Sequence, residues 1–136
     1  MKLKLRDLWQ AKFVFEKFFN KGYDDIKLSY ALSKMAKKVN AEIDEIDKAR
    51  LELVKKHAEK DEKGNPKIDM GRFVFKNQER FNKEFADLLE TEIEIDIWQI
   101  PWRAVEEVKL TPNEFTIISG FVKIEEETPP KTKKVK

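Results

Sequence analysis

Carboxylates form the pattern in this chain that comes closest to a chemical site. Two groups stand out, one around a turn of a predicted helix and one alternating along a predicted strand: Glu42, Asp44, Glu45, Asp47, and Glu92, Glu94, Asp96. Carboxylates that share an environment can divide acid and base roles or bind a hard cation. The acidic residues on the predicted helix include positions that point apart, and those on the predicted strand can pair with a basic strand. The acidic residues also lack the spacing of an EF-hand calcium-binding loop. We therefore expect solvated faces.

Histidine and cysteine usage narrows the chemistry further. His57 is the single histidine and the chain has no cysteine, so the sequence offers no His or Cys cluster for a metal. The serines lie in no nucleophile-elbow pattern, and no phosphate-binding or dinucleotide-binding glycine motif is present. We predict a protein that is not an enzyme, with no catalytic, metal-binding or cofactor-binding residues. His57 is expected either at the surface or in the C-terminal turn of the long predicted helix.

Lysines are a second candidate group, because a helical face of lysines can contact phosphates. Lys34, Lys37 and Lys38 cluster on one long predicted helix. Acidic residues interleave with the lysines of that helix, and the sequence shows no aromatic stacking platform or recognition helix. Nucleic-acid contact through these three lysines is therefore the alternative interpretation.

Large aromatic residues are the more useful signal for binding. Trp9 and Phe13 lie four apart on a predicted helix but off its main apolar stripe, while Trp98 and Trp102 follow or extend a strand. They form either a second internal layer or a surface for a partner or for self-association. We take all four as candidate partner-binding residues. Trp98 is expected to be buried by its strand position, and Trp102 to be exposed because it follows Pro101.

The main element that positions these groups is a helix predicted over residues 25–60, a stretch without proline or glycine. Apolar side chains recur along it four and three apart and define a seam for packing: Leu28, Leu32, Met35, Val39, Ile46, Ala49 and Leu53. An earlier helix over residues 7–20 carries its own stripe: Leu8, Ala11, Val14 or Phe15, and Phe18. The short link between them predicts an antiparallel helix pair.

The remaining pattern completes an α+β fold. A possible hairpin surrounds Gly71, and a third packing helix follows Asn77 to about Glu90. The alternating residues 91–97 predict a strand whose acidic face complements the basic face of residues 2–6, so these two should pair. A capping box with proline predicts a short last helix at Thr111. The fold class is α+β and mainly helical, with an antiparallel helix pair, one long spine helix, a third packing helix and a small antiparallel sheet.

Chain length and charge limit the domain organisation and the classes of partner to be expected. The 136 residues suit a single α+β domain over residues 1–124, followed by a mobile charged tail over residues 125–136. The 28 basic and 26 acidic residues nearly cancel, which does not favour a polyanion as partner. Without a signal-like or membrane-spanning segment, we expect a cytoplasmic protein. Abundant Lys and Glu suit a thermophilic source or an AT-rich genome.

Three stretches carry a resemblance to a known family: IKLSYALSKMAKKV, EIDEIDKARLELVKKHAEKDEKGNPKI and FNKEFADLLETEIEIDI. They resemble an uncharacterised family of small bacteriophage and prophage proteins, over about residues 7–121. The resemblance implies no catalytic residues, since the family has none established. Trp98, Trp102 and the terminal PPKTKKVK segment depart from the family pattern, so any role for them belongs to this chain alone.

These observations favour a non-enzymatic phage or prophage accessory protein that binds another protein, from the phage or the host. Inhibition of the host or of a defence system and assistance in assembly both suit a binding surface on a rigid helix. It would act in the host cytoplasm without a cofactor or a membrane, and homo-oligomers are compatible with the pattern. The alternative is a nucleic-acid-associated phage factor.

The seam of the long helix yields a direct test. Replacing Val39 or Ile46 by Asp should sharply lower the melting temperature, because the substitution would bury an unpaired charge. The same replacement at Lys38 should have little effect. Thermal unfolding of the three variants measures this, and equal small effects at all three positions would contradict the seam.

Overall fold

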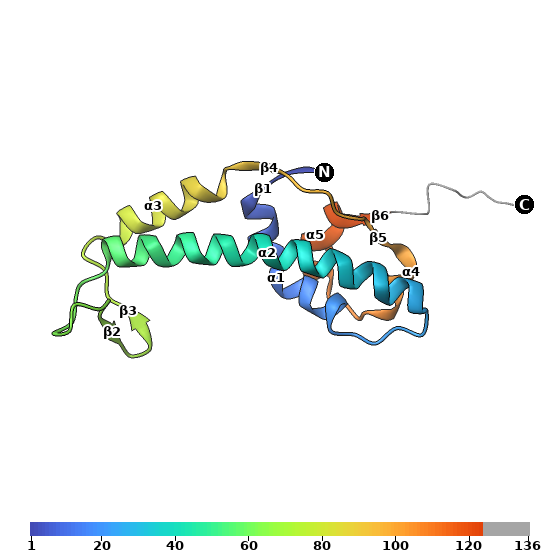
Figure 1. The fold of residues 1–136 in the computed structure, drawn as a ribbon, viewed down its shortest axis with the longest axis horizontal. Coiled ribbons are helices and arrows are strands. Elements are labelled where there is room, and N and C mark those ends of the chain that lie inside the picture. Colours follow the sequence, from blue (N-terminus) through green and yellow to red (C-terminus); the bar gives the residue numbers. More distant parts are fainter. Residues whose placement is uncertain (124–136) are drawn as a thin grey trace, which may run out of the picture. The chain divides into compact units, whose positions relative to one another are not determined.

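The computed structural model describes residues 1–123, which fall into two compact units. Unit 1 comprises Met1–Trp9 and Asn40–Ile95, and unit 2 comprises Gln10–Val39 and residues 96–123. The helices α1 (Leu5–Phe19) and α2 (Ile26–His57) each contribute residues to both units. The predicted tail, residues 125–136, lies outside the described residues. The architecture is α+β and mainly helical, as predicted (Figure 1).

The first helix begins earlier than the sequence pattern suggested. Strand β1 covers only Lys2–Lys4, and α1 starts at Leu5 instead of residue 7. The cause is local, because the Lys4 backbone N–H donates to Asp7 Oδ2 at 3.0 Å and so caps the first turn. The predicted stripe of α1 is confirmed, and both alternatives at its third position are buried: Leu8, Ala11, Val14, Phe15 and Phe18.

The spine helix α2 spans 32 residues. Asp25 caps it, since its Oδ1 accepts hydrogen bonds from the backbone N–H groups of Lys27 and Leu28. The helix ends at His57, three residues before the predicted end at residue 60. Beyond His57 the chain pairs with an extended segment instead, because the Glu59 N–H donates to the Val74 carbonyl at 2.8 Å.

The apolar seam of α2 is confirmed over most of its predicted length and shifts near its end. The first four predicted positions and Ile46 are buried, whereas Ala49 and Leu53 are only half-buried. Val54 and Ala58 take over as the buried positions after Ile46. A straight helix with 3.6 residues per turn drifts away from a strict seven-residue repeat, which explains this shift.

Unit 1 gathers its core around the end of α2. Strands β2 (Ile68–Asp69) and β3 (Arg72–Phe73) form the predicted hairpin, and the left-handed φ angles of Met70 and Gly71 make its tight turn. Helix α3 (Gln78–Leu89) is capped by Asn77 as predicted. The core cluster consists of three buried residues and three partly buried ones: Val54, Ala58, Phe81, and Leu53, Phe73, Phe75.

Strand β4 (Glu92–Glu94) pairs antiparallel with β1, which confirms the predicted pairing of basic and acidic strands (Figure 1). The register sets Lys2 opposite Glu94 and Lys4 opposite Glu92. The Lys4 ammonium nevertheless lies 2.7 Å from Glu90, just before the strand, and Arg6 lies 2.7 Å from the same carboxylate. The charges therefore join the N-terminal segment to the end of α3 as well as to β4.

Unit 2 contains elements that the sequence pattern did not indicate. Strand β5 (Ile100–Pro101) pairs in parallel with β6 (Val122–Lys123), and the short helix α4 (Trp102–Glu107) follows β5 directly. Helix α5 (Pro112–Ile118) has the predicted capping box, and the 3-10 helix η1 (Ser119–Phe121) leads from it to β6. The rings of Phe15 and Phe121 meet edge to face, with centroids 4.9 Å apart.

The strand predicted over residues 91–97 is therefore too long. It ends at Glu94, and residues 95–99 follow without regular structure. The Asp96 carbonyl oxygen, which a longer strand would have used in a ladder, accepts a hydrogen bond from Lys38 Nζ at 2.7 Å. This side-chain contact holds the segment that carries Trp98 against α2.

Candidate functional site

His57 lies in the last turn of α2, the second of its two predicted locations, and it is buried there instead of lying at the surface. Its Nε2 atom contacts Glu84 Oε2 on α3, and Lys56 Nζ donates to Glu84 Oε1 at 2.9 Å. No pattern in the sequence indicated this partner, because Glu84 lies 27 positions away from His57. Among residues 1–123 no group of three or more His, Cys, Asp or Glu side chains is placed to hold a metal. The pair therefore joins the end of α2 to α3.

The charge on Glu84 is stabilised by its neighbours. The hydrogen bond from Lys56 is the largest cause that holds the pKa of Glu84 below its ordinary value, and His57 adds to it, while desolvation opposes both. A depressed carboxyl pKa stabilises the fold at pH values above the ordinary pKa. That stabilisation is lost as the pH falls through the lowered value.

The four predicted partner-binding aromatics differ in how they pack. Trp9 belongs to unit 1, where its ring is half-buried and meets Phe85 edge to face at 5.7 Å. The other three belong to unit 2. Phe13 is 69% exposed on α1, and Trp98 is 40% exposed. The expected burial of Trp98 is wrong, because its segment forms no strand.

Trp102 also differs from its prediction. It begins α4, is half-buried, and its ring lies edge to face against Phe115 at a centroid distance of 5.9 Å. Pro101 ends β5, a strand that the sequence pattern did not indicate, and the helix that follows places Trp102 against Phe115 of α5. Of the four aromatics, Phe13 and Trp98 thus keep the most surface for a partner.

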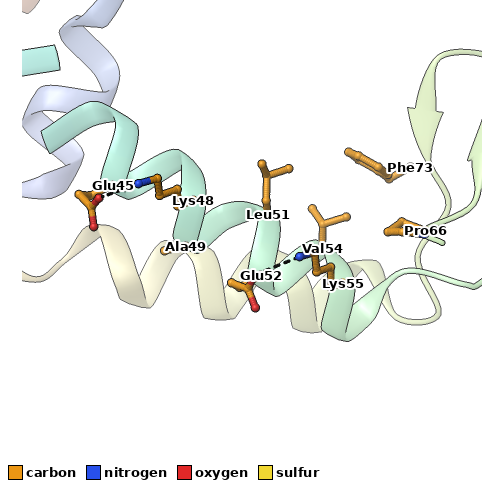
Figure 2. Close-up of a pocket in the computed structure, with 9 residues that line it drawn as sticks. All are labelled: Glu45, Lys48, Ala49, Leu51, Glu52, Val54, Lys55, Pro66 and Phe73. Atoms are coloured by element: carbon orange, nitrogen blue, oxygen red, sulfur yellow. Dashed lines mark hydrogen bonds and ion pairs between the residues drawn. The ribbon is translucent and has the colours of Figure 1, made fainter. Parts of the chain in front are cut away.

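Figure 2 shows the first of two candidate binding surfaces, the unit 1 groove. It has a volume of about 580 Å³ and lies between the second half of α2 and the β2–β3 hairpin region. Its apolar side chains are Leu51 and Val54 from α2, with Pro66 and Phe73 opposite. Leu51 is 37% exposed, which leaves apolar surface open to solvent.

The rim of the unit 1 groove is electrically balanced. Lys48 lies 3.3 Å from Glu45, and Lys55 lies 3.3 Å from Glu52 (Figure 2). In each pair the two partners are about one turn of α2 apart. Two acids and two bases cancel, so the groove has no charge preference for an anion or a cation. Its selectivity must come from apolar contact and shape.

The second surface, the unit 2 groove, brings together residues from the predicted nucleic-acid-binding lysines and from the predicted partner-binding aromatics. It has a volume of about 470 Å³ and includes Lys34 and Lys38 from α2 together with Trp98. Lys37 is exposed on the same half of α2. The predicted interleaving of acids is wrong here, because residues 26–40 contain four lysines and no Asp or Glu. The exposed ring of Tyr30 also lies on this stretch. The sequence-based prediction did not include it, although its position off the apolar seam could have indicated that it is exposed.

Comparisons with known proteins add no relative. No protein-family model, curated protein or solved structure matches this chain. The bacteriophage resemblance therefore stays a prediction. In the described part of the chain, no helix combines the length and the apolar character needed to cross a membrane.

The charge environment of Glu84 predicts a pH-dependent effect. Glu84→Gln should lower the melting temperature at neutral pH, and the difference from the parent should shrink as the pH falls below the ordinary carboxyl pKa of 4.5. Glu62→Gln, in an exposed turn, is the control and should leave the curve unchanged. Melting curves over this pH range measure the effect. A difference that stayed constant into acid would show that the Glu84 charge is not its cause.

The packing of the tryptophans predicts unequal costs of truncation. Trp102→Ala should destabilise the protein by about 2 to 3 kcal/mol, because it removes a half-buried ring from its contact with Phe115. Trp98→Ala should cost under about 1 kcal/mol, because much of its ring already meets solvent. Denaturant titrations at several protein concentrations, with sedimentation as the check for association, compare them. A larger cost at Trp98 would refute this assignment.

Proposed function

We propose that this chain is a non-enzymatic protein-binding protein of the phage or prophage accessory kind, and that the unit 1 groove holds an apolar segment of its partner. The observation that carries the proposal is open apolar surface at a place where α2 and the hairpin region meet. The phage setting rests on the sequence resemblance alone.

Further exposed apolar side chains lie on the hairpin that contributes Phe73 to the groove. On the hairpin, Ile68 is 61% exposed and Met70 is 94% exposed. Groups of exposed apolar side chains are characteristic of protein contact sites. Methionine suits such a site, because its flexible side chain adapts to different partner shapes.

The balanced rim indicates the chemistry of the occupant. A polyanion would gain nothing from Lys48 and Lys55, whose charges are already opposed by neighbouring carboxylates. An amphipathic helix or an extended segment of a protein would place apolar side chains against Leu51 and Phe73. Its own polar groups could then exchange with the paired charges at the rim.

Binding to the groove can be tested with Leu51→Asp, which places a charge on the apolar surface without entering the core. The tagged parent and variant are used to capture proteins from infected or lysogenic cells, and the protein retained by the parent is purified and titrated. We expect the variant to weaken that binding by at least about 10-fold while its melting temperature stays close to that of the parent.

Ile117→Asp is the matched control, because Ile117 is also an exposed apolar residue, 43% exposed, but belongs to unit 2. It should bind the purified partner as the parent does. Equal binding by Leu51→Asp and the parent would refute the groove as the contact site. Sedimentation of the parent alone would reveal whether the occupant is a second copy of this chain.

A further inference from the structure

The two halves of the spine helix α2 differ in charge, although the basic and acidic residues of the whole chain nearly cancel. The side chains of residues 26–40 that are charged at neutral pH are all basic: Lys27, Lys34, Lys37 and Lys38. Residues 41–57 carry five acids and four Lys or Arg residues, so the second half of α2 is balanced. Local positive charge of this kind attracts anions even when the whole chain is nearly neutral.

Helical geometry places this charge beside an exposed ring. Lys27, Lys34 and Lys37 are three, four and seven positions from Tyr30, spacings that share one face of a helix. That face points away from the buried seam that contains Leu28. Tyr30 is 63% exposed, and Lys34 Nζ lies 5.2 Å from the centroid of its ring. An ammonium group and an aromatic surface are thus presented together.

A second exposed ring is held next to the same face. Trp98 lines the unit 2 groove together with Lys34 and Lys38. Lys38 Nζ donates to the Asp96 carbonyl at 2.7 Å and lies 3.5 Å from the Asp96 carboxylate. Lys38 therefore acts as a positioning residue for the segment that carries Trp98, and it offsets the one acidic side chain of the groove.

We propose that this face binds single-stranded nucleic acid, with bases stacking on Tyr30 and Trp98 and phosphates contacting Lys27, Lys34 and Lys37. Stacking on aromatic rings beside a basic track is how proteins bind single strands without reading sequence. A duplex keeps its bases stacked inside and would leave both rings unused. A peptide of Asp and Glu alone would use the lysines but would have no aromatic ring to stack on Tyr30 and Trp98. This proposal is independent of the unit 1 groove and of protein binding there.

Fluorescence anisotropy with a labelled oligothymidylate tests the proposal. We expect binding to the parent that weakens log-linearly as salt rises. The triple variant Lys27→Gln, Lys34→Gln, Lys37→Gln should reduce the salt slope by about 2, from roughly 0.7 for each lost phosphate contact on a single strand. Lys48→Gln with Lys55→Gln, in the balanced half of α2, is the control and should leave the slope unchanged.

The rings are tested separately from the charges. Trp98→Ala should weaken binding by about 10-fold with the salt slope retained, and Trp98→Phe should restore most of the affinity, because phenylalanine still stacks. Phe13→Ala, another exposed aromatic of unit 2, should have no effect. Melting curves confirm that each variant is folded.

Several outcomes would overturn the proposal. It fails if the parent does not bind the oligothymidylate at low salt, or if folded Trp98→Ala binds as tightly as the parent. It also fails if duplex DNA or polyglutamate competes as well as unlabelled single strand, because the face would then be a general anion surface. None of these results bears on capture through the unit 1 groove.

Discussion

The structure depends on the burial of one long apolar seam. Helix α2 cannot cover its own apolar side chains, and packing, more than helix propensity, stabilises helices in proteins. Unit 2 buries the first part of the seam, including Leu28 and Val39, together with side chains from α1. Unit 1 buries the last part, where Val54 and Ala58 meet Phe81. The other elements of each unit complete these two cores.

Helix α2 contributes to two different exposed surfaces. Because these surfaces differ in charge, they suit different classes of partner. The second half pairs its acids and bases at the rim of an apolar groove, which suits a protein segment. The first half has lysines without opposing acids on the helix itself, beside Tyr30 and Trp98. One element can thus serve two classes of partner, because the charge pattern changes along it while the buried seam continues.

Ion pairs in this protein act more as positioning contacts than as a source of stability. The pairs of Glu90 with Lys4 and Arg6 are partly exposed, and exposed pairs contribute little free energy each. Their effect is to fix which segments lie together. Lys38 does this for the segment of Trp98, and Lys56 with His57 does it for α3 through Glu84.

Local patterns in the sequence determined helices α1, α2, α3 and α5, the caps at Asn77 and Thr111, and the pairing of β1 with β4, because each depends on side-chain periodicity or on neighbouring residues. The parallel pairing of β5 with β6, the burial of His57 against Glu84 and the packing of Trp102 on Phe115 were beyond that reading. Each of these joins residues that are distant in the chain, and such contacts produce no periodic pattern in the amino-acid sequence. The exposure of Trp98 is also a matter of tertiary structure, because β4 ends at Glu94 and the segment that follows is bound at Asp96 by Lys38, 58 positions away in the chain.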